Sequence, residues 1–60
     1  MKLAEWLKAK KLTDAEFGEM VDRDRATINR IKRGINKPSF PLIIVIERVT
    51  KNKVRFKDWV

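Results

Sequence analysis

Residues 12–34 read LTDAEFGEMVDRDRATINRIKRG, and this stretch decides the fold. Thr13 and Glu16 have the spacing of a capping box. In this motif the hydroxyl accepts from the amide of the later residue, and the carboxylate reaches back to the amide of the earlier one. A helix is therefore predicted over residues 14–21. Its apolar residues follow at helical spacing and are Phe17, Met20 and Val21.

A second helix is predicted over residues 25–33, directly after a three-residue turn. Asp24 is a good N-cap for it, because its carboxylate can be aimed at the first free amides. Ile28 and Ile31 share one face of this helix and are expected in the core. Gly34 follows where a left-handed residue would end the helix.

Two residues of this stretch are unusual for their positions. Gly18 lies inside a predicted helix, where glycine costs about 1 kcal/mol relative to alanine. We expect the small residue there to let the next helix cross closely. Asp22 occupies the turn, and aspartate is among the few residues besides glycine that tolerate a left-handed conformation. Two short helices joined by a tight turn form a helix-turn-helix arrangement, here over residues 13–33.

The segment before this stretch predicts one more helix, over residues 2–10. Leu3, Trp6 and Leu7 fall at helical spacing and give it an apolar face. Lysines crowd its C-terminal end, where cations complement the helix dipole.

A fourth helix is predicted after the loop that follows Gly34. Ser39 can cap it, and Pro41 suits its first turn. The β-branched run 42–46 would also fit a strand, but the capped, proline-led start favours a helix. Its apolar stripe consists of Leu42, Val45, Ile46 and Val49.

The C-terminal tail gives weaker indications. Residues 50–53 have the composition of a turn, and residues 54–56 alternate as a short extended segment would. Phe56 and Trp59 are expected to hold the tail against the core. The sequence leaves open whether residues 53–60 are helical, extended or part of an interface.

Composition limits what the chain can do. With 60 residues it is expected to form one domain, 1–60, with no room for both a core and a substrate cavity. It contains no cysteine and no histidine, which removes the commonest zinc ligands and the commonest general base. We therefore expect no catalytic residues, metal or cofactor, and no small-molecule substrate. The net charge of +7 favours a polyanionic partner.

Residues 12–31, with Gly34 and Pro38 after them, resemble the XRE/Cro/phage-repressor family of helix-turn-helix proteins. The likeness covers about residues 3–49, and the tail resembles that of small phage-encoded Cro-like or repressor-like proteins. It implies an all-α, compact four- to five-helix domain of the lambda-repressor type. It also implies a sequence-specific transcriptional regulator that places residues 25–33 in the major groove of double-stranded DNA.

The resemblance assigns base reading to Arg25, Ala26 and Arg30, and Asn29 could contact either a base or the backbone. Arginine can pair bidentately with guanine, asparagine with adenine, and alanine can lie on a thymine methyl group. As an alternative, Arg25 could form a surface ion pair with an acidic neighbour. The candidates for phosphate contacts are Lys10, Lys11, Arg23, Thr27, Lys32, Arg33, Asn36 and Lys37.

The sequence departs from the family at the start of the first helix of the motif. The family often has a glutamine there that touches a phosphate, whereas this chain has Asp14, which would repel one. Glu16 and Glu19 lie on the same helix. We expect all three carboxylates to face away from DNA.

Other functions remain open on sequence alone. The same fold could serve as a protein-interaction or antitoxin-like module, or the basic surface could bind nucleic acid without sequence preference. The aromatic residues lie mostly on apolar stripes, which argues against an RNA-stacking platform. Carboxylates on a solvated helix face do not make an acid/base pair in a cleft, so an enzyme is the least favoured reading.

Assembly and location are also expectations. Such units usually bind as two-fold dimers, and a weak homodimer interface could come from Ile43 or Ile44 with Phe40, Trp59 and Val60. The first residues lack the apolar core of a signal peptide, and the apolar run 42–46 is too short to span a membrane. We expect a cytoplasmic protein associated with the nucleoid of a bacterial host.

Overall fold

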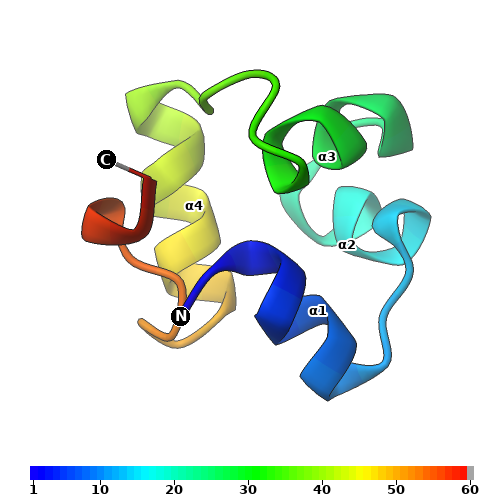
Figure 1. Cartoon of the computed structure of the whole chain (residues 1–60), viewed down its shortest axis with the longest axis horizontal. Helices are drawn as coiled ribbons and strands as arrows, with labels where there is room; N and C mark the ends of the chain where they lie inside the picture. The colour runs from blue at the N-terminus through cyan, green and yellow to red at the C-terminus, as the bar shows by residue number, and fades with distance from the viewer. Residues whose placement is uncertain (60) are drawn as a thin grey trace.

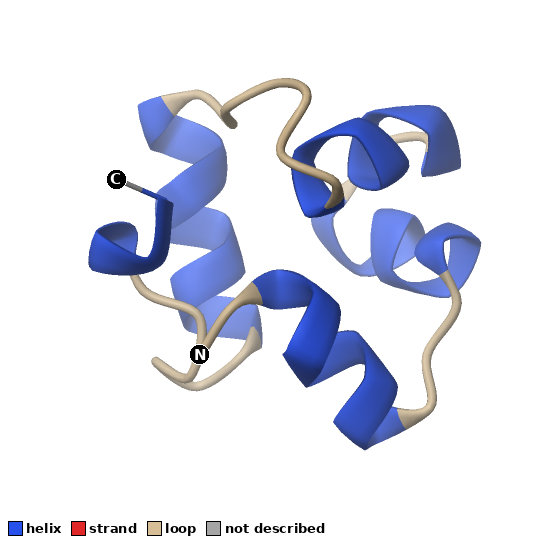
Figure 2. Cartoon of the chain, viewed as in Figure 1, coloured by secondary structure: helices blue, strands red, loops and turns tan. Residues whose placement is uncertain are grey.

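The computed structural model describes residues 1–59 and shows four α-helices followed by a 3₁₀ helix, with no strand in this range (Figures 1 and 2). α2 and α3 lie together on one side of the molecule, α4 lies on the other, and η1 packs beside α4 (Figure 1). The predicted all-α fold is confirmed. The elements are α1 (Leu3–Lys10), α2 (Asp14–Val21), α3 (Arg25–Lys32), α4 (Phe40–Val49) and η1 (Phe56–Trp59).

The helix boundaries follow from the caps. Thr13 Oγ1 accepts from the Glu16 amide at 3.1 Å, and Glu16 Oε1 accepts from the Thr13 amide at 2.9 Å, so the predicted capping box is present. Ser39 Oγ accepts from the Leu42 amide at 3.4 Å at the start of α4. Gly34 has a φ of +81°, and the chain turns out of α3 there as predicted.

One cap differs from the prediction. Asp24 is the N-cap residue of α3, with φ −78° and ψ 161°, but its side chain makes no capping hydrogen bond to an amide. Its carboxylate accepts instead from the hydroxyl of Thr27. The side chain of the third residue of α3 thus bonds this carboxylate in place of a backbone amide.

The core lies where the four α-helices meet. Phe17, Ile28 and Ile46 are completely buried, and Trp6 meets Phe17 edge to face with ring centroids 5.6 Å apart. Burying one such side chain stabilises the fold by about 1.5–3 kcal/mol. The other buried apolar residues of this cluster are Leu3, Leu7, Val21, Ile31, Leu42 and Val54.

The apolar stripes were predicted with some errors. Ile43, placed off the stripe of α4 by its spacing, is only 6% exposed, whereas Val45 is only partly buried. Met20 of α2 is 47% exposed, although it falls at a stripe position. α4 packs against both α2 and the C-terminal tail. Its buried face is therefore wider than the stripe that a single neighbouring helix would cover.

The tail is held by a residue that the sequence analysis did not single out. Val54 is completely buried, whereas Phe56, expected to pin the tail, is 47% exposed and meets Phe40 edge to face at 5.8 Å. Trp59 packs partly buried against the core, as expected. Residues 56–59 form a 3₁₀ helix, so Phe56, the last residue of the predicted extended segment 54–56, is helical. Val60 lies outside the described residues.

Gly18 makes room for the turn of the motif. A Cβ atom at this position would lie under 3.0 Å from the carbonyl oxygen of Arg23, a distance that real Cβ atoms essentially never show. The close neighbour is therefore the backbone before α3, not the helix itself, which corrects the expectation from the sequence. Asp22 adopts the left-handed conformation expected of it, with φ 58° and ψ 47°.

Thr50 joins the end of α4 to the buried start of the tail. It is 2% exposed, its hydroxyl donates to the carbonyl of Ile46 at 2.7 Å, and it accepts from the Val54 amide at 3.1 Å. Replacing Thr50 with valine keeps the shape but leaves the Val54 amide without a partner. We expect the free energy of unfolding to fall by about 1–3 kcal/mol, measured by urea denaturation.

The conservative variant tests the cause. Thr50→Ser keeps the hydroxyl and is expected to retain most of the stability lost in Thr50→Val. A loss of stability in Thr50→Ser together with none in Thr50→Val would show that the methyl group, and not the hydrogen bond, holds the tail.

Candidate nucleic-acid interface

α3 turns one polar face to solvent. Its opposite face is anchored by Ile28 and Ile31, which are 0% and 4% exposed. Because the helix turns by 100° per residue, Ala26, Asn29, Arg30 and Arg33 lie farthest from these anchors, and Arg25 lies at the side of the helix. The surface formed by these five residues is called here the α3 face, and Arg33 belongs to it as the C-cap residue of α3.

The α3 face carries three guanidinium groups. Arg25, Arg30 and Arg33 are all exposed, whereas Ala26 and Asn29 are half-buried. Guanidinium groups stay charged at all relevant pH values and match the paired acceptors of guanine or of phosphate. The four residues assigned to base reading therefore share one surface, together with Arg33, which was assigned to a phosphate.

Asp14 joins α2 to this face. Its Oδ1 accepts from Lys32 Nζ at 2.8 Å, and its Oδ2 accepts from Lys32 Nζ at 3.1 Å and from Asn29 Nδ2 at 3.2 Å. The hydrogen bond from Lys32 holds the pKa of Asp14 below its usual value. The sequence predicted that this carboxylate would repel a phosphate. It also touches two residues assigned to DNA contacts, Asn29 and Lys32.

Two further candidates for phosphate contacts are also engaged within the protein. The Thr27 hydroxyl donates to Asp24, and this hydrogen bond lowers the pKa of the Asp24 carboxyl. Arg23 Nη1 donates to the carbonyl of Asp22 at 2.9 Å. Both contacts are at the exposed surface, so each can be exchanged for a phosphate oxygen at modest cost.

The loop after α3 extends its basic surface. Arg33 precedes the left-handed Gly34, Asn36 and Lys37 follow it, and all three side chains are exposed. Together with Lys32 they line a hollow of about 230 Å³ that Trp59 also borders. These four residues from the predicted phosphate-contact set therefore lie together at the C-terminal end of α3.

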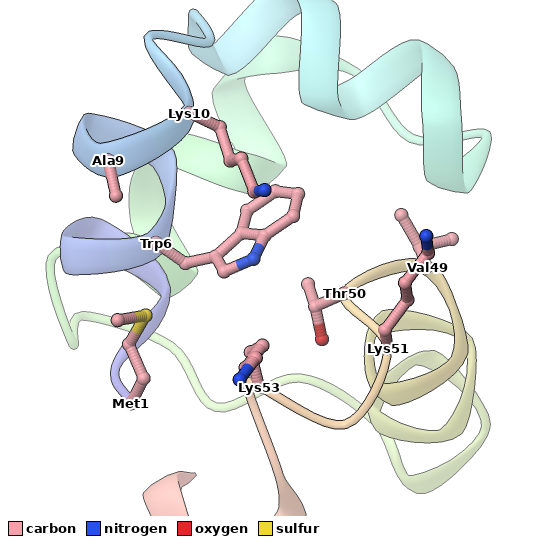
Figure 3. A pocket seen from close by; sticks show the side chains of 8 residues that line it. All are labelled: Met1, Trp6, Ala9, Lys10, Val49, Thr50, Lys51 and Lys53. Carbon is pink, nitrogen blue, oxygen red and sulfur yellow. The ribbon is translucent and has the colours of Figure 1, made fainter.

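Lys10 lies elsewhere. It lines a hollow of about 350 Å³ with Trp6 and Ala9 of α1 and with Lys51 and Lys53 beyond α4 (Figure 3). None of the residues that line this hollow belongs to α2 or α3. Lys10 therefore lines a different hollow from the candidate residues at the C-terminal end of α3. Lys11, the next residue, ends α1 in a left-handed conformation with φ 56°.

Three aspartates give the fold a predictable response to acid. The pKa values of Asp14, Asp24 and Asp58 are lowered from 3.8, chiefly by hydrogen bonds from Lys32, from Thr27 and from the Arg55 amide respectively. Because the unfolded chain binds these protons more readily, their stabilisation is present above about pH 4. It is lost as the pH falls through the lowered values.

We therefore expect the urea midpoint to be flat near neutral pH and to fall below about pH 4. The Asp14→Asn variant should lose less stability over this acid range than the natural chain, because it has one fewer group to protonate. A midpoint that stays constant down to pH 2.5 would show that these hydrogen bonds do not stabilise the folded state.

Comparison with known proteins adds one finding to this geometry. The sequence model of a helix-turn-helix family matches residues 3–56, which include all four α-helices. No curated protein and no solved structure gives a significant match. Within residues 1–59, no helix is both long enough and apolar enough to cross a membrane.

Proposed function

The chain belongs to the XRE and lambda-repressor type of helix-turn-helix family, which is a DNA-binding family, and from this premise we propose that it is a sequence-specific transcriptional regulator. In this proposal α3 enters the major groove of double-stranded DNA. The observation that carries it is the α3 face, which brings three exposed arginines and an asparagine onto one surface of the second helix of the motif. The N-terminal residues of that helix are the ones that meet base edges in such proteins.

The residues of the α3 face would contact different bases. Arg25 and Arg30 would each pair with the O6 and N7 acceptors of a guanine, Asn29 with an adenine, and Ala26 with a thymine methyl group. Phosphate contacts would fix the register on the duplex and would carry little sequence information. They would come from Lys11, Arg23, Thr27, Lys32, Arg33, Asn36 and Lys37, with Lys10 as an outlying contact.

We further propose that the protein acts as a repressor of the Cro or phage-repressor kind, on the nucleoid of a bacterial host. One such unit reads only a few base pairs, so two copies would bind half-sites about 34–36 Å apart. The exposed Phe40 and Phe56, which contact each other, and the exposed Ile44 supply an apolar surface for a weak dimer. Ile43 is buried within the chain and is not available for this contact.

Selection from a random double-stranded DNA library at two salt concentrations tests the function. We expect a short, two-fold-symmetric motif and an affinity that falls steeply with salt, because phosphate contacts release counterions. Salt-sensitive binding without a motif would overturn the proposal and favour a non-specific binder. Absence of DNA binding would favour the protein-interaction reading.

Sedimentation of the protein on a single duplex carrying the selected motif tests the dimer. Phe40→Ala is expected to weaken the binding of the second copy, whereas Met20→Ala, which removes an exposed apolar side chain from α2, should not. One copy per full site, at saturating protein, would contradict the dimer.

A further inference from the structure

The first residue of α2 contacts two residues of α3 at once. Asp14 accepts hydrogen bonds from Asn29 and from Lys32, and the side chains of Asp14 and Lys32 are only 21% and 28% exposed. A carboxylate that is partly shielded from water binds both donors more firmly than a fully solvated one would. The three side chains, called here the Asp14 cluster, therefore behave as a unit at the edge of the α3 face.

The carboxylate of Asp14 fixes which way the Asn29 amide points. An ionised carboxylate accepts hydrogen bonds and cannot donate them, so Asn29 must turn its amino group, and not its carbonyl, toward Asp14. One N–H is used in this contact. The second N–H and Oδ1 remain, and this donor and acceptor match the N7 acceptor and the N6 donor of adenine.

The same carboxylate neutralises Lys32. Its ammonium group lies 2.8 Å from one oxygen and 3.1 Å from the other, so the pair has no net charge. A paired lysine releases fewer counterions when DNA binds than a free one does. Asp14 thus lowers the part of the DNA affinity that comes from phosphate contacts and does not depend on the base sequence.

From these contacts we propose that Asp14 is a specificity-determining positioning residue: it orients Asn29 to read adenine and withholds Lys32 from the phosphate backbone. The inference rests on the proposed function. It reverses the expectation that this carboxylate would only repel DNA. Asp14 itself touches no base in this account and acts through Asn29 and Lys32.

Two substitutions separate the two effects. Asp14→Ala removes both contacts, so the preference for adenine at one position of each half-site should fall by about 5- to 150-fold. The slope of log affinity against log salt should steepen by about 0.9 per protomer, because Lys32 is released. Lys32→Met removes the ammonium group and leaves the contact between Asp14 and Asn29 in place. It should retain the adenine preference and leave the salt slope unchanged, because the paired Lys32 adds little counterion release in the natural chain.

Asn29→Ala and the double variant with Asp14→Ala complete a cycle. If Asp14 acts through Asn29, the double variant should lose no more adenine preference than Asn29→Ala alone. Glu19→Ala, which removes an exposed carboxylate from the same helix, controls for the change in charge. Urea denaturation of each variant shows that it is folded under the binding conditions.

The outcomes are distinct. An unchanged motif and salt slope in Asp14→Ala, with DNA binding intact, would overturn this inference alone. Additive losses in the double variant would overturn the orienting role of Asp14. Failure of the natural chain to bind any duplex would overturn the proposed function, and the base-reading role with it.

Nuclear magnetic resonance of the free protein tests the contact between Asp14 and Asn29 in that case too. The two Asn29 side-chain amide protons should shift as Asp14 is titrated below pH 4, and unshifted resonances would contradict it.

Discussion

Gly18→Ala is expected to lower the free energy of unfolding by about 2 kcal/mol or more, although alanine is the better helix former by about 1 kcal/mol. The added Cβ would lie under 3.0 Å from the carbonyl oxygen of Arg23. That atom belongs to the backbone of the turn and cannot rotate away as a side chain would. For a domain of this size the loss corresponds to a fall of roughly 8–16 °C in the melting temperature, measured by circular dichroism.

Gly34→Ala is the matched control. Gly34 has a φ of +81°, and a Cβ added there would meet nothing within 4 Å. Its loss comes from the left-handed backbone alone and is expected to be about 1–2 kcal/mol. If Gly18→Ala leaves the free energy of unfolding unchanged or raises it, the turn does not approach α2 as closely as described. Helix propensity would then determine the effect of the substitution.

Arg25→Ala and Arg30→Ala should produce the largest losses of DNA affinity. Each exposed guanidinium would form two hydrogen bonds to one guanine, so each substitution should weaken binding to the selected motif by about 5- to 150-fold. Binding to unrelated duplexes should weaken far less, because only the charge is lost there. Fluorescence anisotropy with matched and scrambled duplexes measures both effects.

Arg48→Ala is the control for this pair. Arg48 is an exposed arginine of α4, outside the α3 face, and its loss changes the net charge by the same amount. It should leave the preference for the motif unchanged. If Arg48→Ala and Arg25→Ala reduce affinity equally on both duplexes, net charge and not base reading explains the binding.

The sequence predicts the helices of this protein well because their ends are encoded locally. Thr13 and Glu16 form a capping box at the start of α2. At the start of α4, Ser39 accepts a hydrogen bond from a backbone amide, and Pro41 has no amide hydrogen that would need a partner. α2 spans the predicted residues, and α3 ends one residue early. Periodicity then places Phe17, Ile28 and Ile31 in the core without knowledge of the fold.

What the sequence does not predict depends on contacts between distant residues. Asp14 and Lys32 are 18 positions apart, so no helical spacing links them, and their ion pair exists only because α2 packs on α3. The burial of Val54 likewise requires the tail to fold back over α4. The sequence could therefore place the side chains of the candidate site on α3, but it did not predict that Asp14 contacts two of the candidate residues.

The shortness of the helices has a consequence for how the protein holds DNA. α1, α2 and α3 have eight residues each, and isolated helices of this length are scarcely populated in water. The recognition helix therefore exists only in molecules whose whole core is assembled. The apparent affinity for DNA then scales with the fraction of chains that are folded, so heating should release bound DNA over the same temperature range in which the core melts. A duplex at saturating concentration, in turn, raises the temperature range in which the core melts, because it binds the folded chain.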